Sequence, residues 1–177
     1  MDSTSILNFQ KEIYYFEIQR SEKFDSRLQA PLAIIALLVG FLGFLIKSVK
    51  FTSEPLGVSY FIVAYSFSTF LLIGSLILLQ SAWGGSKYRF LPLANVLDQY
   101  HSDLTKHYTD GDTVDLKSVQ SYYEKAILGY YVECSTHNSL INESRARSLF
   151  WSVILLGGSV ICALISYIPY LSYDLAK

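Results

Sequence analysis

The sequence is poor in charge and in cysteine. Only 16% of its 177 residues are charged, whereas about a quarter of the residues in an average soluble domain carry a charge. The net charge is −1, so the overall balance indicates neither nucleic acid nor an acidic membrane surface as a partner. Two cysteines, Cys134 and Cys162, are too few for a disulfide framework. A disulfide-stabilised domain is therefore not predicted.

Catalytic and metal-binding motifs are also missing. The sequence has no G-x-S-x-G, H-E-x-x-H or phosphate-binding-loop pattern, and no Arg is followed by a His four to six residues later. Cys134 and His137 lie three residues apart, but a zinc site would need further converging ligands. Residues 1–27 carry nine charges and no continuous apolar core, which does not predict a secretion signal. We therefore expect no enzyme, no metal and no cofactor.

What the sequence does contain is three long runs without a charged residue. They cover residues 28–46, 55–86 and 148–173 and are 19, 32 and 26 residues long. A helix that crosses a bilayer needs about 20 mostly apolar residues. The sequence therefore predicts an all-α membrane protein, with three transmembrane helices, long amphipathic cytoplasmic helices and an oligomeric helical bundle.

The predicted regions follow from the positions of these runs. Residues 1–30 are predicted as a cytoplasmic amphipathic helix, 31–83 as a transmembrane helical hairpin, 84–147 as a cytoplasmic helical region and 148–173 as the third transmembrane helix. Eleven Lys and Arg residues lie on the side of the N-terminus and of 84–147, and three lie on the other side. The positive-inside rule then places the N-terminus and residues 84–147 in the cytoplasm.

Two long amphipathic helices are predicted on the cytoplasmic side. The first covers residues 4–30, and the second begins near Val114 and continues into the third span. Their apolar rows are Ile6, Phe9, Ile13, Phe16, Phe24 and Leu28 in the first helix, with Arg20 interrupting the row, and Val119, Tyr122, Ala126 and Tyr130 in the second, with Tyr123, Ile127 and Cys134 beside it. Such rows must be buried on each other or on neighbouring copies, so we expect a coiled helical stalk. A shorter helix over 91–108 and a turn at 109–113 are predicted between them, and no internal repeat is detected.

Polar residues interrupt the second row and form the first candidate site. Asn138, Asn142 and Arg145 are spaced so that they share one helix face. Amide and guanidinium groups there could bind phosphate or nucleobase edges. The alternative is that the Asn pair fixes helix register in an oligomer, while Arg145 and Arg147 anchor the third span.

Basic residues near the predicted membrane surface form a second candidate site. They are Arg20, Lys23, Arg27, Lys87, Arg89, Arg145 and Arg147. If they converge at one level of an oligomer, they could attract an anionic ligand or an oligonucleotide. Positive-inside anchoring alone is the alternative explanation for them.

The second span is the most polar of the three, and its hydroxyl groups are the candidate pore and gate residues. These are Ser66, Ser68, Thr69 and Ser75. They could line a water path with a hydrophobic constriction as the gate. The alternative is that they hold helices together, because small residues such as Ser68, Ser75 and Ser159 permit close helix contact. No span contains a charged residue, which argues against a transporter.

The order of these segments resembles a known group of proteins. A charged, aromatic arm (YYFEIQRSEKFDSRLQAP) leads into the first span, and a long helix carries the pattern Y-x-x-A…N-x-x-x-N-x-x-R before the last span. This layout resembles the small helical membrane effectors of bacterial anti-phage defence systems, which include SLATT-like proteins and the Hailong-type channel effector. It also resembles the small membrane accessory proteins of RNA-targeting CRISPR systems. The best-known members of the first group have two spans, whereas three are predicted here.

The resemblance implies a location and a mode of action. It implies a homo-oligomer, for instance a tetramer, in the bacterial inner membrane, with the C-terminus in the periplasm. It further implies a channel or membrane-permeabilising effector that a nucleotide or oligonucleotide made by a partner enzyme controls. Asn138, Asn142 and Arg145 match the recurrent polar positions of the group. The alternative hypothesis is a non-conducting membrane scaffold that docks a cytoplasmic protein.

Overall fold

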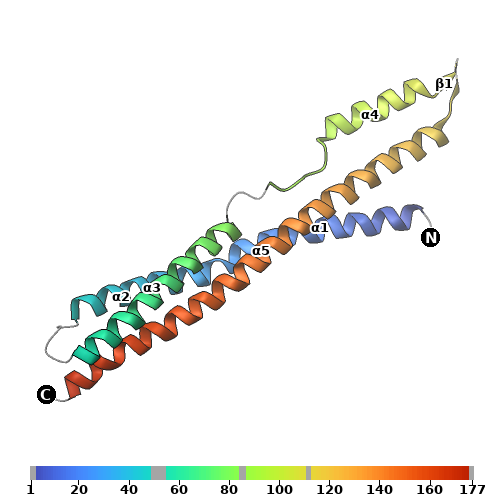
Figure 1. The fold of residues 1–177 in the computed structure, drawn as a ribbon. Coiled ribbons are helices and arrows are strands. Elements are labelled where there is room, and N and C mark those ends of the chain that lie inside the picture. The colour runs from blue at the N-terminus through green and yellow to red at the C-terminus, as the bar shows by residue number, and fades with distance from the viewer. Residues whose placement is uncertain (1–2, 49–54, 84–86, 111–112, 176–177) are drawn as a thin grey trace. The chain divides into compact units, whose positions relative to one another are not determined.

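The fold is all-α, as the sequence predicts. The computed structural model describes residues 3–48, 55–83, 87–110 and 113–175 (Figure 1). Its elements are α1 (Ser3–Arg27), α2 (Gln29–Ser48), α3 (Pro55–Trp83), α4 (Ala94–His107), β1 (Thr109–Asp110), β2 (Thr113–Val114) and α5 (Leu116–Leu175). Three helical stretches of the described chain are long and apolar enough to cross a membrane, namely Ser5–Lys47, Val58–Trp83 and Leu116–Pro169.

The chain divides into two compact units. Unit 1 comprises Met1–Glu22 and Ser86–Glu143, and unit 2 comprises Lys23–Gly85 and Ser144–Lys177. Helices α1 and α5 each contribute residues to both units. Residues 49–54 of the predicted transmembrane hairpin and residues 84–86 at the start of the predicted cytoplasmic region lie outside the described residues.

Helices α1 and α2 follow each other almost without interruption. The amide of Leu28 donates to the carbonyl of Phe24, and the amide of Leu32 donates to that of Leu28, so helical hydrogen bonding continues across the junction. Pro31 has no N–H and therefore cannot bond to the carbonyl four residues earlier, that of Arg27. The missing hydrogen bond to the Arg27 carbonyl separates α1, which ends at Arg27, from α2, which begins at Gln29. The amphipathic arm thus runs into the first span, as predicted.

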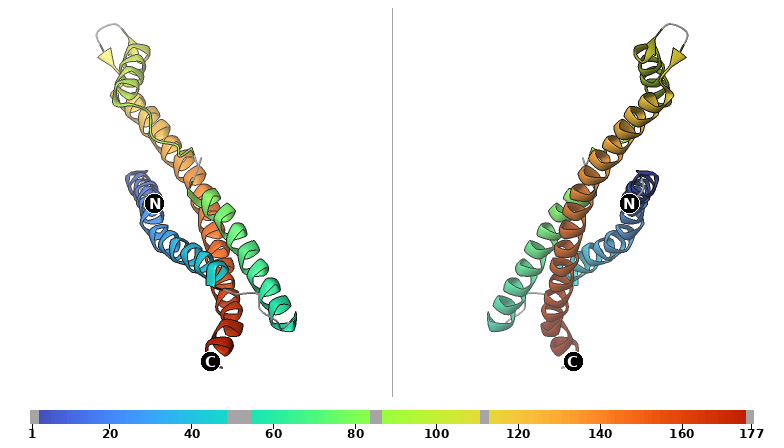
Figure 2. Two further views of the ribbon diagram at one scale, coloured as in Figure 1. Left: turned by 90° about the vertical axis from the view of Figure 1, so that its left-hand side faces the viewer. Right: turned by 90° about the vertical axis from the view of Figure 1, so that its right-hand side faces the viewer.

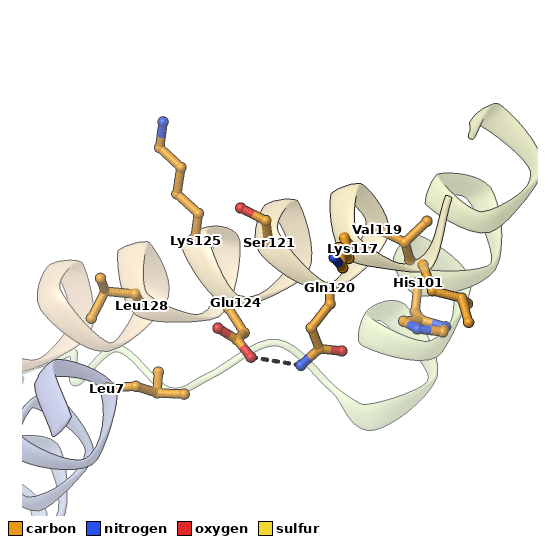
Figure 3. A pocket seen from close by; sticks show the side chains of 10 residues that line it. Leu7, His101, Lys117, Val119, Gln120, Ser121, Glu124, Lys125 and Leu128 are labelled. Carbon is orange, nitrogen blue, oxygen red and sulfur yellow. Dashed lines mark hydrogen bonds between the residues drawn. The ribbon is translucent and has the colours of Figure 1, made fainter. Parts of the chain in front are cut away.

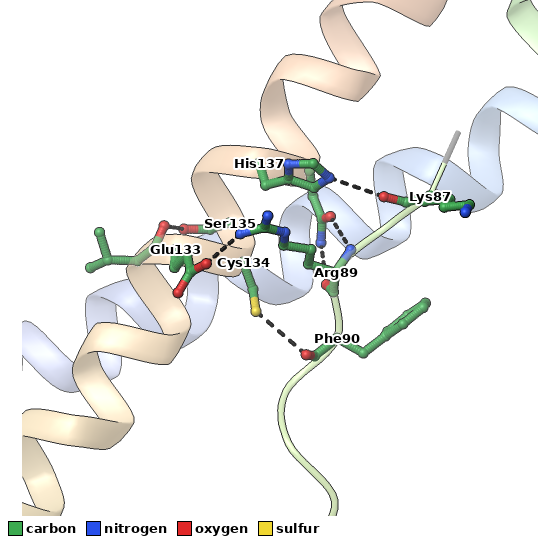
Figure 4. A network of polar contacts seen from close by, with 9 residues as sticks. Lys87, Arg89, Phe90, Glu133, Cys134, Ser135 and His137 are labelled. Carbon is green, nitrogen blue, oxygen red and sulfur yellow. Dashed lines mark hydrogen bonds and ion pairs between the residues drawn. The ribbon is translucent and has the colours of Figure 1, made fainter. Parts of the chain in front are cut away.

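Helix α4 is shorter than the predicted helix over 91–108. It begins at Ala94, because Pro92 disfavours helical geometry for the residue before it. The residues before Ala94 instead run along α5 in an extended conformation (Figure 4). After α4 the chain turns back through the short antiparallel pair of β1 and β2, in which Thr109 faces Val114. Of the predicted turn at 109–113, residues 109–110 and 113 belong to these strands, and residues 111–112 lie outside the described residues.

Helix α5 contains 60 residues and is the longest element. Its start is fixed by Asp115, whose carboxylate accepts hydrogen bonds from the Ser118 amide at 3.2 Å and from the Ser118 hydroxyl at 2.7 Å. A carboxylate at this position satisfies an amide that has no partner within the helix. The prediction of one long helix that enters the third span is confirmed.

The core of unit 2 is formed by α2, α3 and the second part of α5, which lie side by side (Figure 2). Its buried positions recur at three- and four-residue steps on each helix. They include Ile35, Leu38, Leu42 and Leu45 on α2, Phe61, Leu72, Leu79 and Ala82 on α3, and Leu156 and Ala163 on α5. A step of three and a step of four add up to seven residues, and a seven-residue period of buried positions is typical of coiled-coil packing.

The core of unit 1 differs from the predicted apolar rows. Tyr14, Tyr131 and Cys134 form its centre, and the rings of Tyr14 and Tyr131 meet edge to face at 5.6 Å. The predicted row residues Phe9 and Phe16 are 53% and 59% exposed, and Tyr122 and Tyr130 on α5 also lie outside. The prediction of the rows is therefore confirmed only in part. Phe9 and Phe16 are not in the core, where Leu7, Tyr14 and Ile18 pack instead, whereas Phe24, Leu28, Val119 and Cys134 are buried as predicted.

Candidate functional site

Asn138 fastens the 87–93 segment to α5 in unit 1. Its side-chain oxygen accepts from the Arg89 amide at 2.8 Å, and its side-chain nitrogen donates to the Arg89 carbonyl at 2.8 Å (Figure 4). One amide side chain thus satisfies both backbone groups of a residue that lies outside regular secondary structure. Asn138 is fully buried, and a buried backbone group without a partner would be costly.

Neighbouring side chains of α5 extend this contact (Figure 4). His137 Nε2 lies 3.0 Å from the Lys87 carbonyl oxygen, and the Cys134 thiol donates to the Phe90 carbonyl at 3.5 Å. The Arg89 guanidinium forms an ion pair with Glu133. The 87–93 segment is therefore held mainly through its backbone by side chains of α5.

Asn142 joins three segments of unit 1. Its oxygen accepts from the Tyr88 hydroxyl at 2.6 Å, and its nitrogen donates to the Glu17 carbonyl and carboxylate, both at 2.8 Å. Both N–H groups of the amide are used, because an Asn side chain has two donors. Asn142 and Glu17 are both buried. Glu17, which the sequence analysis did not select, also lies 3.6 Å from Arg20.

Arg145 occupies a comparable place in unit 2. It is 5% exposed; its Nε donates to the Ala82 carbonyl and its Nη2 to the Asp25 carboxylate, both at 2.8 Å. Its guanidinium also lies 5.4 Å from the centre of the Phe24 ring. Since Ala82 is in the last turn of α3, Arg145 caps that helix, whose final carbonyls lack helical donors. Arg147, two residues further on, is exposed.

The predicted ligand face is thus made of side chains with partners inside the chain. Asn138, Asn142 and Arg145 each bridge segments that are more than 45 residues apart in the sequence. Within one chain these residues hold segments together; the alternative that the Asn pair fixes helix register in an oligomer stays a prediction. Ligand binding by Asn138, Asn142, Arg145, Arg147 and Arg20 remains a prediction. The partner residues Tyr88, Glu17 and Asp25 have no sequence pattern that marks them in advance.

Two pairs of serines join α3 to α5 in unit 2. The Ser68 hydroxyl donates to the Ser159 carbonyl and the Ser159 hydroxyl to the Ser68 carbonyl, each at 2.8 Å. Ser75 and Ser152 form the same reciprocal pair, with both distances 2.9 Å. All four side chains are fully buried. Of the candidate pore residues, Ser68 and Ser75 are therefore placed at a helix contact.

The two serine pairs belong to a repeated motif that the sequence analysis missed. Residues 68–75 read STFLLIGS and residues 152–159 read SVILLGGS, so five of the eight positions are identical. The helices carry the motif in opposite directions, and the glycine before the last serine of each copy, Gly74 or Gly158, lies against a leucine of the other copy. A Cβ at Gly74 would come within 3.2 Å of Leu155, and one at Gly158 within 3.2 Å of Leu71. This local similarity becomes noticeable once the two helices are seen paired.

The other two candidate pore residues face differently. Thr69 is half-buried, and its hydroxyl donates to the Tyr65 carbonyl of its own helix at 3.0 Å. Ser66 is exposed and belongs to a row with a seven-residue spacing on the outer surface of α3. This row, called the polar row below, consists of Ser59, Ser66, Ile73 and Gln80, all exposed. It brings three polar side chains and one apolar side chain to one side of the second span.

A hollow in unit 1 measures about 770 Å³. It is lined mainly by the first turns of α5, with Leu7 from α1 and His101 from α4 (Figure 3). Gln120 and Glu124, joined by a hydrogen bond of 2.6 Å, lie on its side of α5, whereas Lys125 and Ser121 point away from them (Figure 3). The hollow is open, and its basic residues do not converge on one point.

Titratable groups outside the candidate spans give little sign of reactive chemistry. The hydroxyl and the amide of Ser118 lower the pKa of Asp115, as is expected for a carboxylate at a helix start. A hydrogen bond with Tyr122 raises the pKa of Tyr108, and these two rings stack at 5.4 Å. Within the part of the chain that the structure describes, no three His, Cys, Asp or Glu residues are grouped as metal ligands.

Comparison with known proteins adds no further assignment. No family model matches the chain, and no curated protein or solved structure matches it significantly. What can be stated of the chain therefore rests on its own residues: it is a helical membrane protein with three candidate membrane-spanning helices.

Proposed function

We propose that this protein is a homo-oligomeric membrane channel, or a protein that makes membranes permeable, whose water path runs between copies of the chain. The observation that carries the proposal is the polar row on α3. Ser66 and Gln80 are exposed on a candidate span, where lipid offers no hydrogen-bond partners. Polar side chains in such positions ordinarily face other helices or water.

The interior of unit 2 is unsuited to a water path. The hydroxyls of Ser68 and Ser75 are satisfied by α5, and none of the buried side-chain polar atoms in the described residues is without a partner. Apolar residues fill the remaining core. A path within one copy would require these contacts to break. A path between copies requires only that polar rows of several copies face a common axis.

Ile73 gives the proposed path its gate. It is 52% exposed and lies seven residues from both Ser66 and Gln80 in the polar row. A ring of Ile side chains between polar rings would form a hydrophobic constriction that can close by losing its water. The hydroxyls and the amide on either side would carry water and ions towards it.

Control by a cytoplasmic signal completes the proposal. In line with the resemblance, we assign the protein to bacterial anti-phage defence, with the N-terminus and residues 84–147 in the cytoplasm and a nucleotide or oligonucleotide as the signal. Such a ligand would act by replacing intrachain partners of Asn138, Asn142 or Arg145 with phosphate or base atoms. Moving a closed channel to a mostly open state takes about 5.5 kcal/mol of differential affinity, which charge-assisted hydrogen bonds repeated in each copy can supply.

Ion flux through reconstituted vesicles tests the channel. In liposomes loaded with a fluorescent ion indicator, Ile73→Ser is expected to raise the flux at least tenfold, because it removes the constriction. The matched control is Ile161→Ser, which makes the same change at a 60% exposed position on α5 and should leave the flux unchanged. Ser66→Leu should lower the flux. Equal flux from Ile73→Ser and Ile161→Ser would contradict the proposed path.

A non-conducting scaffold is the second candidate function. It is favoured by the exposed apolar side chains of unit 1, among them Phe90, Leu93 and Leu140, which are 68%, 73% and 64% exposed. Such residues are typical of surfaces that bind another protein. If wild-type vesicles and cells carrying the protein show no flux and no loss of membrane potential, with or without infection, the scaffold is supported and the channel is refuted.

A further inference from the structure

One basic and two aromatic side chains share an outer face of α5 in unit 2. Arg147 is exposed, and Phe150 and Trp151, three and four residues further on, are 59% and 51% exposed. Residues at these spacings are neighbours on a helix surface. The two rings meet edge to face, with 5.5 Å between their centres. This face, called the Arg147 face below, therefore combines a guanidinium with two aromatic rings about one turn further along the helix.

The Arg147 face lies where an uncharged part of the chain begins. Arg147 is the last charged residue before the run 148–173, as Arg27 is before the run 28–46, and both runs belong to candidate membrane spans. Glu143, the nearest acidic residue along α5, is one turn further from the run. A charged side chain is costly within hydrocarbon. Arg147 is therefore expected at the edge of the hydrocarbon, where the lipid phosphates lie.

Contacts between α3 and α5 determine the relative levels of two tryptophans in unit 2. Ser75 and Ser152 exchange hydrogen bonds, so they lie at one level. Trp151 is next to Ser152, whereas Trp83, which is 62% exposed, is eight residues beyond Ser75 towards the same end of the unit. With a rise of about 1.5 Å per residue, Trp83 lies about 10 Å further out than Trp151.

These levels match the layers of a bilayer. With Arg147 at the level of the lipid phosphates, Trp151 lies about 6 Å deeper and Trp83 about 4 Å further out. Tryptophan is enriched at this boundary, where one part of the ring is in apolar and the other in polar surroundings. Arg binds phosphate through two parallel hydrogen bonds. A phospholipid thus offers a phosphate to the guanidinium and acyl chains to the two rings of the Arg147 face.

We propose that the Arg147 face binds an anionic phospholipid, such as phosphatidylglycerol, in preference to a zwitterionic one. The preference follows from the charge of the headgroup. The ammonium group of a zwitterionic lipid neutralises its own phosphate and is repelled by the guanidinium, whereas an anionic lipid keeps its net charge for Arg147. The proposal uses only the candidate spans and goes beyond the proposed channel, which concerns the polar row of α3.

Fluorescence quenching by brominated lipids tests whether lipid reaches this face, because Trp83 and Trp151 are the only tryptophans of the chain. The full chain with Trp83→Phe keeps Trp151 alone and is reconstituted into vesicles. Bromine in the upper half of the acyl chains should quench Trp151 more than bromine near their ends. In the Trp151→Phe variant, a nitroxide on the headgroup should quench Trp83 best. No quenching of Trp151 by any lipid would refute the proposal, since protein would then cover the face.

The preference for anionic lipid is measured in the Trp83→Phe protein. Two vesicle samples contain equal amounts of phosphatidylglycerol and phosphatidylcholine, with the bromine on one lipid or on the other. Quenching should show a preference of about threefold for phosphatidylglycerol, since a basic residue near an anionic surface attracts it. Arg147→Gln should abolish the preference. The matched control, Lys47→Gln, removes a positive charge from an exposed position at the far end of α2 and should retain it.

The remaining outcomes are distinct. Equal quenching in the two samples would show contact with lipid but no anionic site, and would refute the proposal. A preference that survives Arg147→Gln would overturn the assignment to Arg147. Neither measurement depends on ion flux, so the lipid site and the proposed channel fail separately.

Discussion

In unit 1, amide side chains hold an extended segment against a helix, whereas in unit 2 hydroxyl side chains hold two helices together. Asn138 uses both ends of its side chain on the backbone of Arg89. Ser68 and Ser159 instead exchange hydrogen bonds with each other's carbonyls. The amide reaches a strand-like segment beside the helix, while the short serine side chain works only where two helix backbones approach closely.

The difference reflects the surroundings that each unit is built for. In lipid, apolar side chains gain little by leaving the solvent, so spans associate through close packing and small polar groups. Exposed residues of unit 2 such as Phe70 and Ile77 therefore suit contact with lipid. Unit 1 also exposes apolar residues, such as Phe16 and Leu140, and if unit 1 lies in the cytoplasm, as the sequence predicts, the hydrophobic effect favours their burial against protein.

Replacing Arg145 is expected to reduce the stability of the protein more than any other substitution considered. The substitution tests how far unit 2 depends on contacts of a charged side chain. Arg145→Ala removes the donor to the Ala82 carbonyl and the partner of Asp25. The free energy of unfolding is expected to fall by about 3 kcal/mol, because several hydrogen bonds of a buried charged group are lost together. The measurement is reversible unfolding in mixed micelles, followed by circular dichroism. Arg147→Ala, at an exposed position, should change stability far less, and equal losses would contradict the role given to Arg145.

Asn138 provides the corresponding test in unit 1. Asn138→Ala leaves the amide and the carbonyl of Arg89 without their partner and is expected to cost about 2 kcal/mol. The effect should be local, so hydrogen exchange of residues 87–93 should accelerate while that of α3 stays unchanged. Thr136→Ala, an exposed change on the same helix, serves as the control. Unchanged exchange of the 87–93 segment would show that Asn138 does not hold it.

Replacing a serine of the Ser68–Ser159 pair should reduce stability least. Ser68→Ala or Ser159→Ala is expected to cost about 0.6 kcal/mol, the average for hydrogen bonds between membrane helices. The double variant should lose less than the sum of the single losses, because both substitutions break the same pair. Ser66→Ala on the exposed face of α3 is the control. A loss above that of Asn138→Ala would overturn the contrast drawn between the two units.

The main elements could be predicted from the sequence because each depends on local composition. Uncharged runs located the three spans, and the uninterrupted pattern after Val114 predicted the long helix α5. The structure starts α4 at Ala94, three residues later than predicted. Pro92 disfavours a helical Leu91 and could have been read from the sequence, whereas the hydrogen bonds from α5 to Lys87 and Arg89 come from residues more than 45 positions away. The inner face of α1 was also assigned in part to the wrong residues, since Phe9 and Phe16 fit a helical row as well as Leu7 and Tyr14 do.

The candidate site, too, could be predicted from the sequence only in part. The sequence identified Asn138, Asn142 and Arg145 as polar residues on an apolar helix face, and the structure adds their partners Arg89, Glu17 and Ala82. Their spacing along one helix could be read directly. Which backbone groups they satisfy could not, because those groups belong to other segments and carry no mark in the sequence.

By itself the sequence determined that the chain is helical, where its three apolar spans lie and which polar residues interrupt them, because helix formation and apolar length are properties of contiguous residues. Only the tertiary structure decided which serines face a neighbouring helix and which face outward. Ser66 and Ser68 are two residues apart and chemically identical, yet one is exposed and the other fully buried. That distinction depends on how α3 is rotated against α5, and the rotation is set by reciprocal contacts between residues 91 positions apart.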